Sequence, residues 1–345
     1  QSQMIDLLHS IQCILSDKKM EAQIKTGKVG IVGSGLIGRS WAMLFAAAGY
    51  QVKIYDVDPS RMTQALEEIK LQLQDLDKRG LLRGELTVDK QFSRISTTAT
   101  PEECIKDTFY IQESVPEEVE LKKKVHTELD KFIGSNTILA SSTSAILPSI
   151  ISEALVHRNR FIVVHPTNPP FCVPMVELCP APWTDPEVLE TTRALMKDIG
   201  QKPVTINKEI DGFVLNRIQS AILGEGWRLV RDNVISVEDF DIVMKHGLGR
   251  RYAFMGPFET AYLNAEGWKG LSEHYVDTFY RVEKTFGEPE KMVGPTVDKI
   301  QNECNKKIPI EKLQEGRQWR DRRLTALAKL IKDMEEKEDN QAEIQ

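Results

Sequence analysis

The chain has 345 residues, about twice the length of an ordinary single domain, so two domains are expected. Hydrophobic residues make up 41% of the sequence and charged residues 28%, a globular composition that excludes collagen-like and low-complexity chains. Because 45 Lys and Arg face 51 Asp and Glu, the net charge of −6 provides no general attraction to nucleic acid or anionic lipid. We therefore expect neither a nucleic-acid partner nor a membrane partner.

The cysteines indicate a reducing compartment. They are five in number, lie far apart and show no Cys-x-x-Cys or paired Cys and His spacing: Cys13, Cys104, Cys172, Cys179 and Cys304. An odd, scattered set is not typical of a disulfide framework or of a zinc site. The sequence also lacks a run of the roughly 18 apolar residues that span a bilayer. These features predict a cytoplasmic protein without a bound metal.

Residues 1–25 are expected to form a flexible N-terminal extension. Within them, Met4–Leu15 alternates apolar and polar residues and has no basic segment before it, which makes it a poor signal peptide. A frayed amphipathic helix is the favoured interpretation, and the extension contributes nothing to the functional prediction.

From Lys28 onward, short apolar runs alternate with longer amphipathic segments, the pattern of βαβ units around a parallel sheet. The expected strands are Lys28–Gly33, Gln51–Tyr55, Phe92–Ser96, Thr108–Glu113, Thr137–Ala140, Arg160–Val164 and Lys202–Ile206. The clearest helices between them are Pro59–Arg79 and Glu117–Phe132. Residues 26–210 are therefore predicted to form an α/β domain.

The alternation ends near Asp211, and the rest of the chain has helical periodicity. The expected helices include Phe213–Asp232, Val237–Lys245 and Glu311–Lys337. We predict an all-α domain over residues 211–335, followed by a charged tail over residues 336–345.

A glycine-rich loop follows the first expected strand. It reads Gly33-Ser-Gly35-Leu36-Ile37-Gly38 and precedes an apolar helix expected to start at Ser40. In this spacing the first glycine makes a tight turn, the second lets the backbone approach a pyrophosphate, and the third allows close packing of helix on strand. The helix N-terminus then faces the phosphates. The loop predicts a dinucleotide site, although glycine-rich turns are common on their own.

Asp56 ends the second expected strand, where a carboxylate accepts hydrogen bonds from the hydroxyls of an adenosine ribose. Val57 and Asp58 follow it, and no Arg or Lys stands immediately after it to hold a 2′-phosphate. The sequence therefore favours NAD over NADP. The alternative is that Asp56 is a turn or N-cap residue ahead of Pro59.

A second informative stretch places polar residues after strand-like runs, at Ser144, His165, Asn168 and Glu177. Such residues are expected at the carboxyl edge of a parallel sheet, where open α/β folds bind ligands. His165 has a suitable pKa range to take a proton from an alcohol, and Glu177 would hold its tautomer. The alternatives are a buried structural histidine and a serine run that caps a helix.

Several motifs together resemble the 3-hydroxyacyl-CoA dehydrogenase superfamily. They are Gly33–Gly38, the Ser144 segment, His165-x-x-Asn168-Pro, Glu177 and Asp211-Gly-Phe-Val-Leu-Asn216-Arg217, and the resemblance extends over residues 28–335. It implies a Rossmann-type NAD-binding α/β domain followed by an all-α C-terminal domain. It also implies a homodimer paired through the helical domain, where Ala221–Leu223 and Trp227–Val230 carry excess apolar surface.

The resemblance also implies residue roles. His165 would be the general base, with Glu177 as its orienting carboxylate. Ser144 and Asn216 would hydrogen-bond the reacting oxygen, and Asn168 would order the same pocket. A further pair, Glu117 and Lys122, corresponds to residues that the family uses on the NAD side, although Glu and Lys at this spacing are more commonly solvated.

The implied reaction is the oxidation of the 3-hydroxyl of a small hydroxy or sugar acid by NAD, with L-gulonate, converted to 3-dehydro-L-gulonate, as the expected substrate. Pro166 and Thr167 stand where acyl-CoA members usually carry aromatic residues, which makes the pocket mouth more polar. Arg251 is the candidate for binding the carboxylate, with a surface salt bridge as the alternative.

Two other functions stay open, and a third is disfavoured. A short-chain 3-hydroxyacyl-CoA dehydrogenase would use the same chemistry, and a structural protein would retain NAD binding without turnover. A dehydrogenase of the 6-phosphogluconate type would need a lysine early in the helical domain, where this chain has Asn216 and Arg217.

Overall fold

The computed structural model describes residues 27–342. The predictions for residues 1–25 and for the last three residues of the tail lie outside this range. The chain divides into two compact units. One extends to Asn216 and includes Leu324–Ala328, and the other comprises Arg217–Arg323 and the residues from Lys329 onward.

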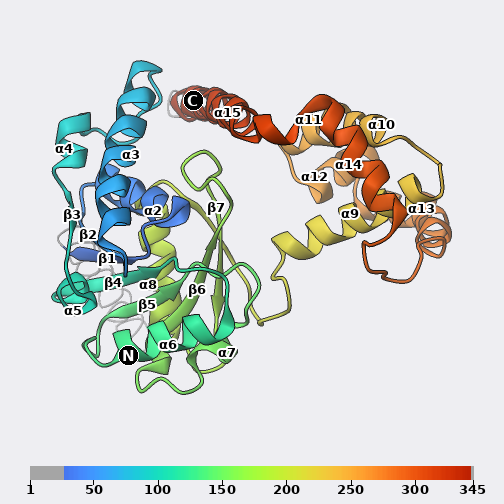
Figure 1. Ribbon diagram of the computed structural model, residues 1–345. Coiled ribbons are helices and arrows are strands. Elements are labelled where there is room, and N and C mark those ends of the chain that lie inside the picture. The colour runs from blue at the N-terminus through green and yellow to red at the C-terminus, as the bar shows by residue number, and fades with distance from the viewer. Residues whose placement is uncertain (1–26, 343–345) are drawn as a thin grey trace, which may run out of the picture. The chain divides into compact units, whose positions relative to one another are not determined.

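The first unit is built on an eight-stranded sheet in the order β3-β2-β1-β4-β5-β6-β7-β8 (Figure 1). The strands are β1 Lys28–Val32, β2 Gln51–Tyr55, β3 Ile95–Thr97, β4 Thr108–Glu113, β5 Ile138–Ser141, β6 Phe161–Pro166, β7 Met175–Pro180 and β8 Lys202–Thr205. Neighbouring strands are parallel except β6 and β7. Strand order reverses at β1, which lies between β2 and β4, and such a reversal is where open α/β sheets bind ligands.

Helices cover both faces of this sheet. They are α2 Leu36–Ala47, α3 Pro59–Lys78, α4 Val88–Phe92, α5 Pro101–Ile105, α6 Val119–Asp130, α7 Pro148–Ser152, the 3₁₀ turn Arg158–Arg160 and α8 Pro186–Asp198. The helices α2, α3 and α8 pack on one face and α5, α6 and α7 on the other. The predicted fold class, a Rossmann-type α/β domain followed by helices, is confirmed.

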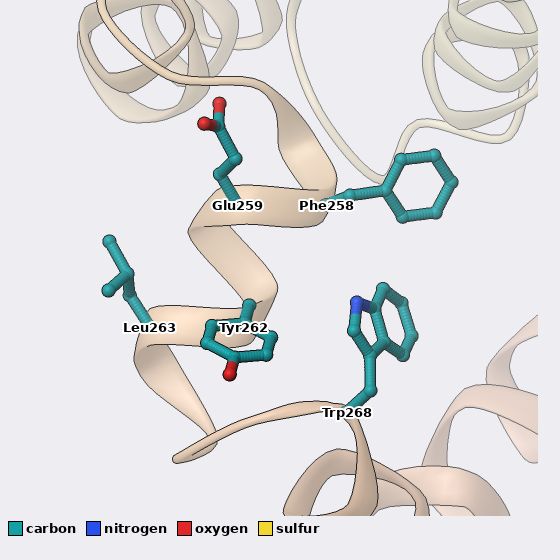
Figure 2. Close-up of a pocket in the computed structure, with 5 residues that line it drawn as sticks. All are labelled: Phe258, Glu259, Tyr262, Leu263 and Trp268. Atoms are coloured by element: carbon teal, nitrogen blue, oxygen red, sulfur yellow. The ribbon is translucent and has the colours of Figure 1, made fainter. Parts of the chain in front are cut away.

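The second unit is helical in its described residues. It comprises most of α9 Leu215–Arg231, then α10 Val237–Ile242, a π-helical turn Val243–Leu248, α11 Gly249–Tyr252, α12 Pro257–Asn264, α13 Trp268–Glu283, α14 Pro295–Lys307, the 3₁₀ turn Ile310–Lys312 and most of α15 Leu313–Ala342. Many of its aromatic side chains are exposed, and Phe258, Tyr262 and Trp268 line a shallow pocket on α12 and α13 (Figure 2). Over residues 27–342, no helix is both long enough and apolar enough to cross a membrane.

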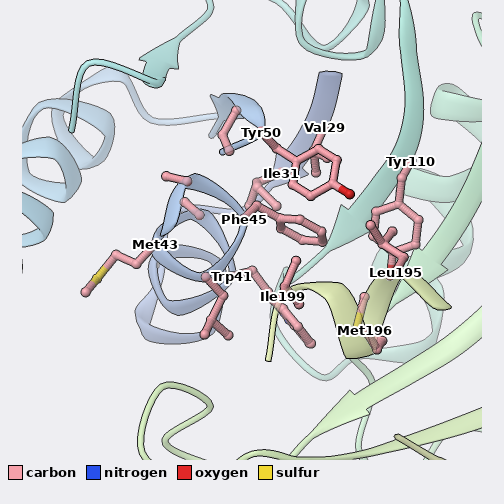
Figure 3. Packing of buried hydrophobic residues seen from close by; sticks show 14 of the residues in the cluster. Val29, Ile31, Trp41, Met43, Phe45, Tyr50, Tyr110, Leu195, Met196 and Ile199 are labelled. Carbon is pink, nitrogen blue, oxygen red and sulfur yellow. The ribbon is translucent and has the colours of Figure 1, made fainter. Parts of the chain in front are cut away.

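The core of the first unit follows from the alternation of side chains along each strand. In β6, Ile162 and Val164 pack with one cluster, whereas Phe161 and Val163 pack with the cluster on the opposite face. The helix α2 contributes Phe45, whose ring lies 5.6 Å from that of Tyr110 on β4 (Figure 3). Because both faces are covered, the glycine loop and the strand ends are held on a rigid base.

Two local predictions were wrong, and one strand was not predicted. The antiparallel strand β7 was not expected, because Met175–Pro180 is a short run between prolines that resembles a loop. The predicted strand Phe92–Ser96 begins as helix α4, since the Thr87 side chain caps a short turn there, and the strand comprises Ile95–Thr97. Ser40 does not start α2; its hydroxyl bonds Leu36 O at 2.8 Å within the helix.

Candidate active site

The glycine loop leaves open space beside the N-terminus of α2. Gly33 has a φ of +106°, and a Cβ on it would lie 2.6 Å from Ser114 O. A Cβ on Gly38 would lie 1.9 Å from Gly33 O, so both positions require glycine. Around Gly35, by contrast, no atom beyond the adjoining backbone lies within 4 Å of the position of a Cβ. This open backbone fits the phosphates of a dinucleotide.

The first turn of α2 adjoins that space. Leu36 begins the helix and is 46% exposed, and Ile37 is half-buried. The intrahelical hydrogen bonds begin with Arg39 N donating to Gly35 O at 2.9 Å. The N–H groups that precede this bond have no partner further back in the helix, so they are available to an anion.

Asp56 lies at the carboxyl end of β2, next to the loop. Its Oδ2 accepts hydrogen bonds from Ser34 N at 2.8 Å and from Ser34 Oγ at 2.7 Å. Asp58, not Asp56, is the N-cap of α3, and it accepts a bond from Ser60 N. Asp56 also supports the turn, since its Oδ1 accepts from Asp58 N at 3.2 Å. The N-cap alternative for Asp56 was therefore wrong, whereas the turn alternative describes one of its contacts.

His165 and Glu177 form a buried pair across β6 and β7. They are directly opposite in the register, and His165 Nδ1 lies 2.7 Å from Glu177 Oε2. The two residues are 6% and 1% exposed. Because β7 runs antiparallel, its beginning meets the end of β6, which brings the carboxylate to the imidazole. A proton held on Nδ1 leaves Nε2 as the basic nitrogen.

Glu177 also binds the chain where α9 begins. Its Oε1 accepts hydrogen bonds from Val214 N and Leu215 N, both at 2.8 Å. Burial favours the neutral acid, but the hydrogen bonds from His165 and these two N–H groups hold the pKa of Glu177 below its ordinary value. Glu177 is therefore charged at neutral pH and stabilises a protonated imidazole.

Ser144 and Asn216 meet at the same strand edge. Asn216 Nδ2 donates to the backbone oxygen of Ser144 at 2.7 Å. Ser144 follows β5 and is half-buried, and its N–H and hydroxyl both bond Glu117 Oε1, at 2.8 Å and 3.1 Å. The structure thus brings Ser144, Asn216 and Glu117 together.

A buried polar cluster that sequence reasoning missed lies behind this segment. Glu113 ends β4 and is 0% exposed, and its carboxylate contacts Lys122, His126 and Ser141. Burial alone would raise the pKa of Glu113, but the hydrogen bond with His126 and the charge on Lys122 lower it to about 2. The signal was an acidic residue at the end of a strand whose centre, Phe109–Ile111, is apolar. Lys122 is buried in this cluster, so the solvated alternative for it was wrong.

Two expected site residues are exposed. Asn168 is exposed beyond β6, before a cis peptide bond to Pro169. Arg251 belongs to the second unit and is exposed in α11. Among residues 27–342, no group of His, Cys, Asp and Glu has an arrangement that could hold a metal ion.

Comparison with known proteins gives matches along most of the chain. The model of the 3-hydroxyacyl-CoA dehydrogenase NAD-binding domain matches residues 28–210, and that of the C-terminal domain of the same family matches residues 212–299.

Similar sequences include rabbit (Oryctolagus cuniculus) lambda-crystallin, which is 47% identical over 90% of this chain and 98% of its own. An L-carnitine dehydrogenase of Oceanobacillus iheyensis is 33% identical over 89% of this chain and 98% of its own. Among solved structures, the NAD-dependent dismutase 5-formyl-3-hydroxy-2-methylpyridine 4-carboxylic acid 5-dehydrogenase has a TM-score of 0.71 and 26% identity. That match covers 89% of this chain and 99% of the other. NAD is therefore the cofactor of the first unit.

Proposed function

The chain belongs to the 3-hydroxyacyl-CoA dehydrogenase family, and on that premise we propose that it oxidises the 3-hydroxyl of a small hydroxy acid, with His165 as the general base. The observation that carries the proposal is the buried contact of 2.7 Å between His165 Nδ1 and Glu177 Oε2. A base in this arrangement has a fixed tautomer and a carboxylate behind it.

The proposed chemistry divides among a few side chains. His165 takes the alcohol proton at Nε2, and the Glu177 carboxylate stabilises the imidazolium that results. Ser144 and Asn216, joined at 2.7 Å, hold the reacting oxygen, and Asn168 closes the same pocket. When bound at Gly33, Gly35, Leu36, Ile37, Gly38 and Asp56, NAD supplies the hydride acceptor.

We propose L-gulonate as the substrate. Pro166 and Thr167 follow the base and give the pocket mouth a polar character that suits a sugar acid better than a fatty acyl chain. The similarity to a protein named L-carnitine dehydrogenase supports a small free substrate. Arg251, an exposed guanidinium, is the proposed ligand of the substrate carboxylate.

We also propose that the protein is a cytoplasmic homodimer. No disulfide joins Cys104, Cys172, Cys179 and Cys304, which suits a reducing compartment. The exposed aromatic side chains of the second unit, such as Phe258 at 72% and Tyr280 at 62%, are best covered by a second copy. A molar mass equal to one chain, measured by light scattering at micromolar concentration, would contradict the dimer.

A substrate panel tests the proposed reaction. The purified protein is assayed with NAD and with NADP on L-gulonate, on other free 3-hydroxy acids and on 3-hydroxybutyryl-CoA. The proposal expects reduction of NAD with the free acids and a much lower kcat/KM with the thioester. No turnover with any free hydroxy acid would overturn it.

A second candidate follows from the name of the matched family, because both family models describe 3-hydroxyacyl-CoA dehydrogenases. A strong preference for the thioester in the same panel would favour it. A structural role, suggested by the similarity to lambda-crystallin, would leave NADH binding without turnover of any substrate.

A further inference from the structure

Ser114 is the first residue after β4 and lies beside the glycine loop. Its N–H donates to Val32 O at 2.7 Å, so the pairing of β4 with β1 extends to this residue. The approach to the loop is close, since a Cβ on Gly33 would lie 2.6 Å from Ser114 O. The residue is half-buried. Ser114 therefore belongs to the edge of the sheet where the dinucleotide loop lies.

A polar network lies behind the Ser114 hydroxyl. Ser114 Oγ is 3.0 Å from Ser142 Oγ, in the segment after β5. The Ser142 oxygen also accepts from Trp41 Nε1 at 3.1 Å and from Gln112 Nε2 at 2.7 Å. Trp41 and Gln112 are 0% exposed. The helix α2 and two strand ends thus meet at the Ser142 hydroxyl.

The orientation of the Gln112 amide is set by two neighbours. Tyr110 OH donates to Gln112 Oε1 at 2.5 Å, and burial raises the pKa of Tyr110 well above its ordinary value, so the phenol keeps its proton. Gln112 Nε2 also faces Val164 O at 3.4 Å, and a carbonyl oxygen can only accept. A flipped amide would place two carbonyl oxygens against each other. Gln112 is therefore a donor to Ser142.

A count of protons then assigns the contact between the two serines. A serine hydroxyl donates one hydrogen bond and accepts two. The N–H groups of Trp41 and Gln112 occupy both acceptor positions of Ser142. Ser142 therefore donates to Ser114. Within the described part of the chain, Ser142 is the one partner of the Ser114 hydroxyl, so the proton of Ser114 has no acceptor there.

The order of the strands indicates which part of the cofactor reaches Ser114. Neighbouring strands follow the order β2-β1-β4-β5-β6. Asp56 follows β2, where the adenosine ribose is expected, and the phosphates are expected at the glycine loop after β1. Ser144 follows β5 and His165 lies on β6, where the reacting carbon is expected. Ser114, at the end of β4, lies between the phosphate site and the reacting carbon along this edge.

We infer that Ser114 is a further cofactor-binding residue, whose hydroxyl donates a hydrogen bond to an oxygen of the nicotinamide nucleoside of NAD. Trp41 and Ser142 are positioning residues, because their hydrogen bonds keep the Ser114 proton out of the network and available to the cofactor. This role depends on NAD as the cofactor and not on which hydroxy acid is oxidised.

The test compares NADH with ADP, which has the adenosine and both phosphates but no nicotinamide nucleoside. Ser114→Ala removes the donor. We expect its Kd for NADH, from fluorescence titration, to rise about threefold to tenfold, which corresponds to the loss of one hydrogen bond. The Kd for ADP, from calorimetry, should stay within about twofold and so also show that the loop is intact.

The matched control removes a serine hydroxyl at the opposite edge of the sheet. Ser93 precedes β3, is exposed, and donates to Lys90 O at 3.0 Å. Ser93→Ala should leave the Kd values for NADH and ADP unchanged.

Trp41→Phe tests the positioning role. It keeps an aromatic ring in the core (Figure 3) but removes the N–H, which lets Ser142 accept from Ser114 and turns the proton away from the cofactor. We expect a rise in the Kd for NADH that is smaller than the rise for Ser114→Ala. In the Ser114→Ala background, Trp41→Phe should add no further rise, because the hydroxyl that it positions is already absent.

A Ser114→Ala variant whose Kd for NADH stays within about twofold of the wild-type value would overturn the inference. An equal rise in the Kd for ADP would also overturn it, because the contact would then not be to the nicotinamide nucleoside. Additive effects of the two substitutions would refute the positioning role of Trp41. Failure of the proposed function is a separate result, since both Kd values are measured without a substrate.

Discussion

The two units of the chain differ sharply in how much apolar surface they bury. In the α/β unit, large side chains such as Trp41, Phe45 and Tyr110 are 0% exposed and belong to one continuous cluster. Within the described part of the helical unit, Trp227 and Val230 are the large apolar side chains that are buried. Large exposed apolar patches of this kind are the surface that the proposed dimer would cover. The difference teaches that the α/β unit has a large core of its own, whereas the described helical unit leaves most of its large apolar side chains exposed.

The variant with the largest expected effect, His165→Gln, tests whether the α/β unit carries the catalytic residue. His165→Gln should lower kcat by about 10²–10⁴-fold, because the proposed general base is lost, while the Kd for NADH stays within about twofold. His157→Gln is the control, since His157 contacts Asp130 at 2.9 Å elsewhere in the unit. Steady-state kinetics and fluorescence titration measure both. A His165→Gln enzyme with full activity would refute the assignment.

A matched pair of aromatic truncations tests the difference in burial directly. Phe45→Ala should lower the free energy of unfolding by about 3–5 kcal/mol, because Phe45 is 0% exposed in the α/β core. Phe279→Ala, at a side chain 53% exposed in α13, should cost less than about 0.5 kcal/mol under conditions where the protein is monomeric. Urea unfolding gives both values. Similar losses for the two variants would mean that the helical unit has a core of its own.

The Asp56→Asn variant tests how much of the preference for NAD over NADP depends on this one carboxylate. Asp56→Asn should raise the KM for NAD about tenfold, because a hydrogen bond to a charged acceptor contributes about 1.5–3 kcal/mol. The control is Asp58→Asn, which keeps a side chain able to cap α3. Initial rates against NAD and NADP measure the effect. A wild-type enzyme that uses NADP better than NAD would remove the basis of the argument.

The last prediction concerns the pH dependence of stability, because the contribution of the Glu113 charge is lost only on acidification. Its pKa is lowered from 4.5 to about 2, so the unfolded chain binds more protons between these values. The stabilisation is present above pH 4.5 and is lost as the pH falls towards about 2. Denaturant unfolding from pH 6 to pH 2 should show a steeper loss for the wild type than for the Glu113→Gln and Lys122→Met double variant. Parallel curves would contradict the depressed pKa.

The sequence predicted those features that depend on spacing along the chain. Three glycines and Asp56 occur at intervals that indicate a dinucleotide loop, and the helical periodicity after Asp211 is plain. The strand β7 was not predicted. Its direction is set by antiparallel pairing with β6, and no local sequence pattern reveals that pairing. The burial of Lys122 was not predicted for a related reason, because it depends on Glu113, which lies nine positions earlier on a different element.

The contacts of Glu177 make the alignment of His165 more sensitive to local unfolding than cofactor binding is. Glu177 orients His165 with one oxygen and holds Val214 and Leu215, where α9 begins, with the other. The dinucleotide loop uses none of these residues. A chain in which the start of α9 has unravelled would therefore still take up its cofactor but would have lost the alignment of its proposed base. Loss of activity would then precede loss of NADH binding during heating or ageing, so binding would overstate the fraction of competent enzyme.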